Sequence, residues 1–314
     1  MIPLAENSGP TVIAAVIGLG SMGKGMALSM KRAGLDVVGY DIMPGAVDRF
    51  VAEGGRGAAS PADAAADADI VVSVVVNGAQ TESVLFGPQG IAATMKADAV
   101  FISSATMDPA VARNLAKRTE ALGLHYLDAP ISGGAAKAAR GELTIMASGS
   151  RKAFETARPA LDAMAGKVYE LGNAAGTGAA FKMINQLLAG VHIAAACEAI
   201  TFAAKQGLDL DKVYEVITAS AGNSWMFENR VPHILAGDYA PLSSIEIFVK
   251  DLGIVQDMAR SERYPTPLAA AALQMYLAAA GAGMGRDDDS SLARLYAKLS
   301  GAELPGSAKE PQSL

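Results

Sequence analysis

The sequence predicts an α/β protein in which a doubly wound, parallel sheet is followed by a second domain made only of helices. Up to about residue 173, short β-branched runs alternate with Ala-rich stretches that favour helices, and this alternation is typical of a parallel sheet. From about residue 179, strand signals are nearly absent, and helical patterns continue to about residue 300. A glycine-rich link over residues 172–178 separates the two patterns, so we expect domains at residues 1–175 and 176–314.

The expected elements of the first domain follow from this alternation of apolar runs and Ala-rich stretches. Strands are expected at residues 12–17, 36–40, 69–75, 99–103, 124–128, 143–148 and 167–171. Helices are expected near residues 22–33, 45–53, 109–121 and 151–164, with a further short helix after Pro61. In the second domain, residues 179–206 contain no proline and predict one long helix.

The first expected strand leads into a glycine-rich turn, which a helix-forming stretch follows. The second expected strand then ends at Asp41, 21 residues after Gly20. This order of strand, turn, helix, strand and acid is that of a dinucleotide-binding, Rossmann-like domain. Gly18 allows the tight turn, Gly20 lets the backbone approach a pyrophosphate, and Gly23 lets helix and strand pack closely. The whole turn consists of Gly18, Leu19, Gly20, Ser21, Met22 and Gly23.

Asp41 distinguishes between the two nicotinamide cofactors. A carboxylate at this place accepts hydrogen bonds from both adenosine ribose hydroxyls and repels a 2′-phosphate. The residues that follow, Ile42 to Pro44, offer no Arg or Lys to hold that phosphate. The alternative is a solvated aspartate in an ordinary turn. We expect NAD rather than NADP as the cofactor.

Length, composition and charge argue against several classes of partner. Of the 314 residues, 51% are hydrophobic and 18% are charged. We therefore expect a well-buried protein of two domains with an apolar subunit interface, in a homodimer or homotetramer. The net charge of −6, with scattered Lys and Arg, argues against nucleic acid or an anionic membrane as a partner. Polar residues interrupt the apolar stretches, so we expect no membrane span.

Cysteine and histidine usage bears on location and on metals. The single cysteine, Cys197, excludes an internal disulfide and fits a reducing compartment. Residues 1–10 lack the basic and apolar regions of a signal peptide, so we expect a cytoplasmic protein. His125, His192 and His233 lie far apart in the sequence and show no ligand spacing, so we expect no metal site.

Two segments carry groups that suit catalysis. Lys182 begins the long expected helix in an otherwise apolar stretch, and a lysine partly buried at a cleft can act as a base near neutral pH. The alternative is a lysine that extends to solvent. The loop 128–134 offers the Ser132 hydroxyl and the N–H groups of Gly133 and Gly134, which suit a carboxylate. The same residues also suit an ordinary turn.

Four segments together resemble the signatures of the β-hydroxyacid dehydrogenase family. They are residues 18–23, 128–134, 176–185 and 250–253, in the family's order and spacing. The resemblance covers the chain from about residue 12 to residue 300 and implies NAD-dependent oxidation of a small hydroxy acid, most closely a sugar acid. Reduction of 2-hydroxy-3-oxopropionate and oxidation of 3-hydroxyisobutyrate are the alternatives within the family. A non-catalytic dinucleotide-binding module is the alternative outside it.

The resemblance also implies roles for individual residues. Lys182 would be the catalytic base and acid, and Asn185 would orient the substrate beside it. The loop residues Ser132, Gly133 and Gly134 would hold the substrate carboxylate. Beyond the glycine turn and Asp41, the residues implied to bind the cofactor or to support its binding are Val75, Val76, Thr106, Lys250 and Asp251.

Three positions depart from the family pattern. Val76 stands where most members have proline, Gln186 replaces the second asparagine of Lys-x-x-Asn-Asn, and Ser103 replaces an aspartate. These differences put the general family substrates in question more than the hydride transfer itself. A set of polar residues is expected to serve several substrate hydroxyl groups: Asn185, Gln186, Asn223, Ser224 and Asn229.

Overall fold

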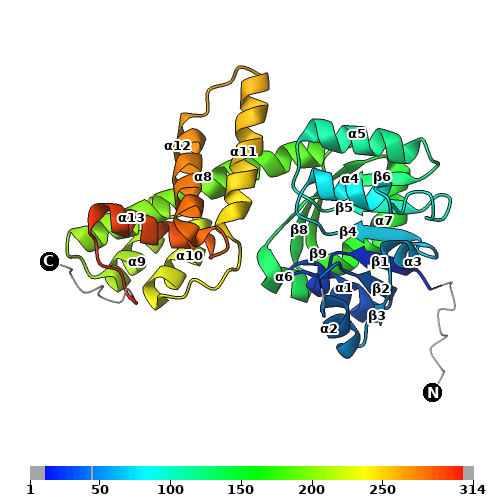
Figure 1. Ribbon diagram of the computed structural model, residues 1–314, viewed down its shortest axis with the longest axis horizontal. Helices are drawn as coiled ribbons and strands as arrows, with labels where there is room; N and C mark the ends of the chain where they lie inside the picture. Colours follow the sequence, from blue (N-terminus) through cyan, green and yellow to red (C-terminus); the bar gives the residue numbers. More distant parts are fainter. Residues whose placement is uncertain (1–10, 44, 307–314) are drawn as a thin grey trace. The chain divides into compact units, whose positions relative to one another are not determined.

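The computed structural model describes residues 11–43 and 45–306 (Figure 1). The chain divides into two compact units, of which the first ends at Lys182 and the second begins at Met183. This division falls inside one long helix, α8 (Thr177–Lys205), which starts just after the predicted domain boundary at residues 175–176. Each unit has a hydrophobic core of its own.

Among the described residues, the first unit contains one sheet of nine strands in the order β3-β2-β1-β4-β5-β6-β8-β7, with β9 beside β8. The strands are β1 (Ile13–Ile17), β2 (Asp36–Tyr40), β3 (Arg56–Gly57), β4 (Ile70–Ser73), β5 (Val100–Ser103), β6 (His125–Asp128), β7 (Ile131–Ser132), β8 (Leu143–Gly149) and β9 (Ala165–Glu170). From β3 to β6 all neighbours are parallel, as predicted. Beyond β6 the sheet is mixed, because β8 runs antiparallel to both β6 and β7.

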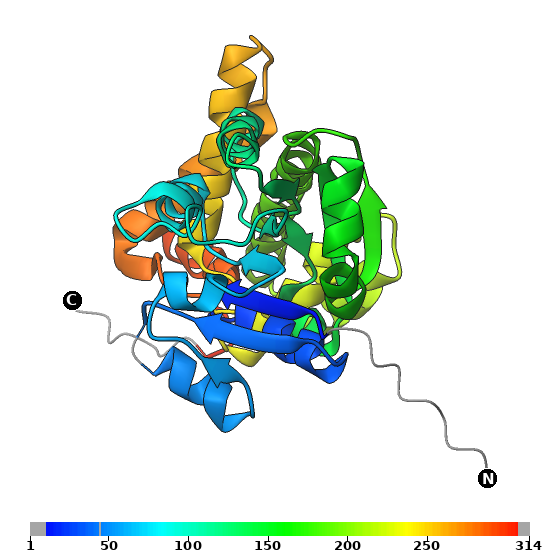
Figure 2. The same ribbon diagram turned by 90° about the vertical axis from the view of Figure 1, so that its right-hand side faces the viewer.

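Helices cover both faces of this sheet (Figure 2). They are α1 (Gly23–Arg32), α2 (Ala46–Ala52), α3 (Pro61–Ala65), α4 (Gly78–Phe86), α5 (Pro109–Glu120), α6 (Gly134–Arg140) and α7 (Arg151–Met164). On one face, Met26 of α1 and Leu161 of α7 are fully buried in the core. On the other face, Leu85 of α4 and Leu115 of α5 are buried. The two cores confirm the doubly wound, Rossmann-like arrangement that the alternating sequence pattern predicts.

Some short elements of the first unit carry too little pattern to be predicted. The strands β3 and β7 have two residues each, which is too short for any periodicity to show. The helices α4 and α6 are also absent from the expected elements. Asn77 caps the N-terminus of α4 by accepting a hydrogen bond from the Gln80 N–H at 2.8 Å. The periodicity of apolar residues does not reveal such a cap.

The second unit contains only helices among its described residues, apart from one isolated bridge between Ser244 and Asp288. After α8 come α9 (Leu210–Thr218), α10 (Trp225–Ala236), α11 (Ile245–Ser261), α12 (Pro267–Ala279), a π-helical turn η1 (Ala280–Met284), a 3₁₀ turn η2 (Asp289–Ser291) and α13 (Leu292–Ser300). Their core includes Met183, Ile193 and Ile200 of α8, each almost fully buried. The all-helical second domain is therefore confirmed.

Two helical runs, Thr177–Lys205 and Pro267–Met284, are long and apolar enough to cross a membrane by length and composition. Polar residues do interrupt these runs, but by this measure they do not exclude a span, contrary to the sequence interpretation. Half of the most apolar window of the first run is buried inside the protein, as expected for a core helix. A buried core helix passes the same test of length and composition, so the two runs are weak evidence for a membrane protein.

Candidate active site

The glycine turn between β1 and α1 is closely packed at its two ends and open in its middle. Gly18 has a φ of +101°, and a Cβ there would lie 2.4 Å from the Val74 carbonyl oxygen. A Cβ on Gly23 would lie 1.8 Å from the Gly18 carbonyl oxygen. Gly20, in contrast, is exposed and has nothing within 4 Å of the place of its Cβ. The turn therefore fits a dinucleotide, since a pyrophosphate needs open backbone before a helix N-terminus.

Asp41 connects the end of β2 to the glycine turn. One carboxylate oxygen, Oδ2, accepts a hydrogen bond from the Leu19 N–H at 2.6 Å. The other oxygen accepts one from the Met43 N–H at 2.7 Å. Each carboxylate oxygen has about two acceptor sites, so capacity remains for ribose hydroxyls. Asp41 thus fixes the conformation of the turn and can still accept hydrogen bonds from ribose hydroxyls.

The loops that follow the central strands leave from one edge of the sheet. Ile17, the last residue of β1, pairs with Ser73, the last residue of β4. Ser73 pairs with Ser103, and Ser103 in turn pairs with Asp128 at the end of β6. Because β1 and β4 lie side by side where the strand order reverses, this edge is where open α/β sheets bind ligands.

The predicted cofactor residues of the first unit follow these strand ends. Val75 is half-buried and Val76 is 46% exposed after β4. The Val76 N–H donates to Oε1 of Gln80 at 2.8 Å, so α4 holds this loop in place. Thr106 is half-buried after β5. The structure brings these residues to the edge that carries the glycine turn, and their contacts with a cofactor stay a prediction.

The loop predicted to hold a carboxylate has the backbone that its glycines allow. Gly133 and Gly134 have φ angles of +133° and +76°, which favour glycine. Ser132 ends the short strand β7 and is half-buried, and Gly134 begins α6. A Cβ on Gly134 would meet nothing within 4 Å, so its backbone is open to a ligand.

Lys182 is buried and its ammonium points back to this loop. Its side chain is part of the first unit, and its Nζ donates a hydrogen bond to the Ile131 carbonyl oxygen at 2.8 Å. Of the two sequence interpretations, a lysine extended to solvent is therefore wrong. The structure places the ammonium one residue away from Ser132, in the segment expected to hold the substrate carboxylate.

Asp128 fixes the start of α8, a role that the sequence interpretation missed. Its Oδ2 accepts hydrogen bonds from the Gly176 N–H at 2.8 Å and the Ala179 N–H at 2.9 Å. The Ser148 hydroxyl donates to the same oxygen at 3.3 Å and accepts from the Gly178 N–H at 2.9 Å. Burial raises the pKa of Asp128, and the hydrogen bonds from Ala179 and Gly176 oppose that rise. Lys182 lies less than two turns further along the helix that these contacts hold.

In the second unit, four polar side chains of α8 and α11 form a chain. Asn185 donates from Nδ2 to Oε1 of Gln186 at 3.0 Å. Gln186 donates from Nε2 to Oδ2 of Asp251 at 2.5 Å. The ammonium of Lys250 lies 2.9 Å from Oδ1 of Asp251. Gln186 and Asp251 are buried, whereas Asn185 and Lys250 are half-buried. The structure thus joins Lys250 and Asp251, as the resemblance implies, and adds Gln186 between Asp251 and Asn185.

Three members of the polar set expected to serve substrate hydroxyls have local partners instead. Ser224 caps α10 by accepting a hydrogen bond from the Phe227 N–H at 3.0 Å. Asn223 donates to Oε1 of Glu228 at 2.5 Å and to the Thr218 carbonyl at 3.1 Å. Asn229 accepts from the Arg230 guanidinium. These contacts lie at helix ends and, for Asn229, beside a buried ion pair, whereas the buried Oδ1 of Asn223 has no hydrogen-bond partner among the described residues. A role of the three residues toward substrate hydroxyls stays a prediction.

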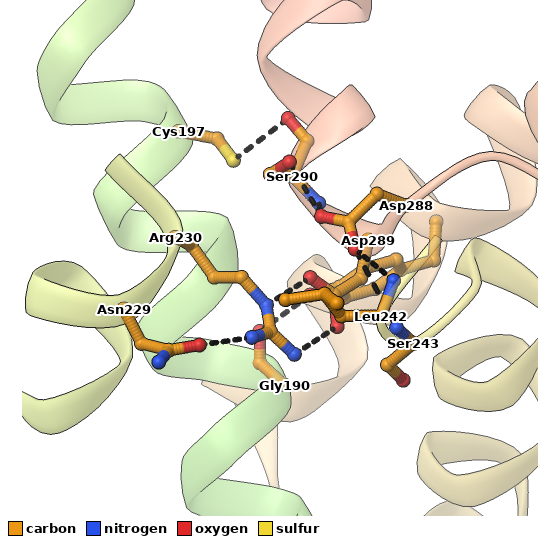
Figure 3. A network of polar contacts seen from close by, with 10 residues as sticks. Gly190, Cys197, Asn229, Arg230, Leu242, Ser243, Asp288, Asp289 and Ser290 are labelled. Atoms are coloured by element: carbon orange, nitrogen blue, oxygen red, sulfur yellow. Dashed lines mark hydrogen bonds and ion pairs between the residues drawn. The ribbon is translucent and has the colours of Figure 1, made fainter. Parts of the chain in front are cut away.

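That ion pair is the centre of a buried polar network in the helical unit (Figure 3). Arg230 donates from Nε and Nη2 to the two carboxylate oxygens of Asp289, at 2.5 and 3.0 Å. Asp288 accepts from the Leu242 N–H at 2.9 Å and from the Ser290 hydroxyl at 2.6 Å. Burial raises the pKa of Asp289 to about 6, although Arg230 favours its charged form. The network connects α10 to the turn before α13 and is structural.

Comparisons with known proteins agree with this geometry. Residues 13–172 match the model of the NAD-binding domain of 6-phosphogluconate dehydrogenase. Residues 176–296 match the model described as NAD-binding of NADP-dependent 3-hydroxyisobutyrate dehydrogenase. The chain is 54% identical to an L-threonate dehydrogenase of Cupriavidus necator, over 94% of this chain and 98% of that one. It is 51% identical to an L-threonate dehydrogenase of Haemophilus influenzae, over 96% and 98%.

A solved structure gives the same result for the fold. A 3-hydroxyisobutyrate dehydrogenase from Salmonella typhimurium superposes with a TM-score of 0.87 at 49% identity, over 90% of this chain and 99% of that one. Both halves of the chain therefore match one family, and the glycine turn that fits a dinucleotide lies in the half that matches an NAD-binding domain. The chain belongs to the β-hydroxyacid dehydrogenase family and is an NAD-dependent dehydrogenase.

Proposed function

We propose that this dehydrogenase oxidises L-threonate at C2, giving 2-dehydro-L-erythronate, NADH and a proton. The assignment of L-threonate as substrate is supported by the sequence identity of 54% and 51% to two proteins named L-threonate dehydrogenase, over nearly their whole length. The buried Lys182, hydrogen-bonded to the loop that contains Ser132, supports acid–base chemistry on a hydroxy acid. The alternative of a non-catalytic module explains neither feature.

The residues of the chain divide the work as follows. Lys182, as the neutral amine, takes the proton of the C2 hydroxyl as the carbinol carbon is oxidised, and as the ammonium it returns a proton in the reverse direction. Ser132, Gly133 and Gly134 hold the carboxylate, which fixes the position of C2. Asn185 accepts a hydrogen bond from a hydroxyl of the acid. Alignment of this kind lowers the activation barrier by an amount on the order of 7 kcal/mol.

Each predicted cofactor residue has a proposed role. The glycine turn receives the pyrophosphate, Asp41 the adenosine ribose, and Val75, Val76 and Thr106 lie along the strand-end edge. Lys250 contacts the cofactor and Asp251 supports that lysine through their ion pair. When bound, NAD supplies the acceptor for the hydride that leaves C2.

A panel of hydroxy acids tests the proposal. The purified chain with NAD is offered L-threonate, D-threonate, D-glycerate and 3-hydroxyisobutyrate, and NADH formation gives kcat/KM for each. We expect L-threonate to be the best substrate, because a site that hydrogen-bonds hydroxyls discriminates strongly against an acid with a methyl group instead. The Salmonella typhimurium relative carries the name 3-hydroxyisobutyrate dehydrogenase, so that acid is the competing candidate. A higher kcat/KM for 3-hydroxyisobutyrate would overturn the L-threonate assignment.

We also propose that the enzyme is a cytoplasmic homodimer or homotetramer, with neither nucleic acid nor a membrane as a partner. An apolar groove of about 620 Å³ in the helical unit supports the assembly, since Phe202 and Leu268 on its walls are 66% and 72% exposed. A second copy of the chain is its proposed occupant. Light scattering measures the mass in solution, and the mass of a single chain at micromolar concentration would contradict the assembly.

A further inference from the structure

Gln186 departs from the family pattern and is also the middle member of the chain of side chains on α8 and α11. It is 7% exposed, and both ends of its amide group are hydrogen-bonded. One end contacts Asp251 and the other contacts Asn185, the residue implied to orient the substrate. The asparagine usual at this position is one methylene shorter, so it would not reach both partners without a shift of the helices. The longer side chain of glutamine therefore allows one amide group to bridge Asp251 and Asn185.

The carboxylate of Asp251 sets the direction of the hydrogen bonds that link it to Gln186 and Asn185. A carboxylate only accepts hydrogen bonds, so the Gln186 amide must turn its NH₂ group to Asp251. Its Oε1 then faces Asn185, and an oxygen there requires that Asn185 turn its own NH₂ group to it. The orientation of an isolated amide is ambiguous, but here the carboxylate settles both amides in sequence. The ammonium of Lys250 lies against the other oxygen of Asp251 and is itself only a donor.

We propose that Gln186 and Asp251 are positioning residues that set the orientation of the Asn185 amide and thereby the choice of substrate. With its Nδ2 held by Gln186, Asn185 presents Oδ1 as an acceptor, which suits a hydroxyl of the acid and not a methyl group. The inference rests on the proposed hydroxy acid oxidation, but it holds for whichever acid proves best in the panel. It assigns to Asp251 a second task besides its ion pair with Lys250.

A double-mutant cycle on Gln186 and Asn185 tests whether the first acts through the second. Gln186→Ala is expected to raise KM for the best hydroxy acid about tenfold, with a smaller change in kcat and in KM for NAD. In the Asn185→Ala background, Gln186→Ala should cost little more, because the group that it positions is gone. Fully additive effects of the two changes would overturn the proposal. Additivity leaves the reaction itself unaffected, so this failure is distinct from failure of the proposed function.

A charge exchange provides a test that does not depend on lost packing. Gln186→Glu places a second carboxylate against Asp251, and the repulsion should raise KM for the hydroxy acid more than tenfold. Adding Asp251→Asn restores the pattern, because the new amide donates to the carboxylate at 186 while Asn185 still donates to it. The net charge of this pair then equals that of the unmodified protein. We expect the double variant to regain most of the lost affinity, and a double variant no better than the single Gln186→Glu variant would refute the directional chain.

Gln256→Ala is the matched control for these variants. Gln256 is a partly buried glutamine on α11, the helix of Asp251, and it accepts a hydrogen bond from the Thr266 hydroxyl at 3.3 Å. It has no part in the chain, so KM for the hydroxy acid should stay within about twofold of the unmodified value. An equal rise of KM in Gln256→Ala and Gln186→Ala would show a general loosening of α11 and would overturn the positioning role.

Discussion

The two units prepare a site in different ways. In the first unit, the backbone forms most of the site. Closely packed glycines shape the turn, and strand ends in register bring loops to one edge of the sheet. In the helical unit, the work is done by side chains, because straight helices offer no free backbone groups along their length. Asn185, Gln186 and Asp251 are oriented by their contacts with one another, and Asp251 also by its ion pair with Lys250.

This difference has a consequence for tolerance to change. A backbone site fails when an added atom collides with a carbonyl, whereas a chain of side chains fails when one polar partner is removed. The helical unit also contains a second polar network around Arg230 and Asp289, which resembles the first in chemistry and has a structural role. Substitutions should therefore separate three effects, on catalysis, on stability and on cofactor binding.

The largest effect is expected at Lys182, where a side chain of the first unit would perform the chemistry. Lys182→Ala should lower kcat by a factor of roughly 10² to 10⁴ with NAD affinity little changed, because general acid–base catalysis contributes about that much. Lys212→Ala is the control, since that lysine is exposed and pairs with Glu215. Steady-state kinetics and NAD titration measure both variants. Near-normal turnover of Lys182→Ala would show that the lysine is not the base.

The next largest effect should be on stability and not on catalysis. Arg230→Ala leaves the buried carboxylate of Asp289 without its partner, which costs about 3–5 kcal/mol of the free energy of unfolding. Any protein that remains folded should keep its KM for substrate and for NAD. Arg151→Ala, which breaks a pair on an arginine side chain that is 93% exposed, should change stability by less than about 1 kcal/mol. Denaturant unfolding of the three proteins gives the comparison, and equal stability of the two variants would contradict it.

The features that could be predicted from the sequence are those set by local backbone requirements. The glycine turn, Asp41 and the parallel strands β1, β2, β4, β5 and β6 each show a sequence pattern within a few residues. The reversal of β8 shows no such pattern, because strand direction is decided by pairing with β6, some twenty residues away in the sequence. The same holds for Asp128, whose partners Gly176 and Ala179 are 48 and 51 residues away.

Side-chain roles were the least predictable part of the site. For Lys182 the sequence allows both a base and a solvent-exposed lysine; burial and a hydrogen bond to Ile131 exclude the second, and the role of base stays a prediction. Asn223 and Ser224 were expected near substrate hydroxyls, but polar residues next to a helix start also serve as caps, and Ser224 does so. A periodic pattern shows which face of a helix is apolar, and it contains no information on which polar side chains meet.

The glycine turn allows a paired test of the backbone site. Gly23→Ala places a Cβ where only 1.8 Å separates it from a carbonyl oxygen, so the turn must distort and stability should fall by about 1–3 kcal/mol. Gly20→Ala meets no neighbour, so the protein should fold normally and yet bind NAD about tenfold more weakly, because the methyl group occupies the approach of the pyrophosphate. Calorimetric titration with NAD and thermal unfolding separate the two. Unchanged NAD affinity in Gly20→Ala would place the pyrophosphate elsewhere.

The smallest effect is expected at Asp41, where one side chain belongs to the backbone site. Asp41→Ala removes the acceptors of the Leu19 and Met43 N–H groups together with the charge, so it should weaken NAD binding and erode the preference for NAD. Asp41→Asn loses the charge and one of the two acceptor oxygens, and its remaining oxygen can still accept from the Leu19 N–H. It should therefore keep the turn and lower the ratio of kcat/KM for NAD over NADP about tenfold. The unmodified enzyme must prefer NAD for this reasoning to hold, and equal use of both cofactors would show that the carboxylate does not face the ribose.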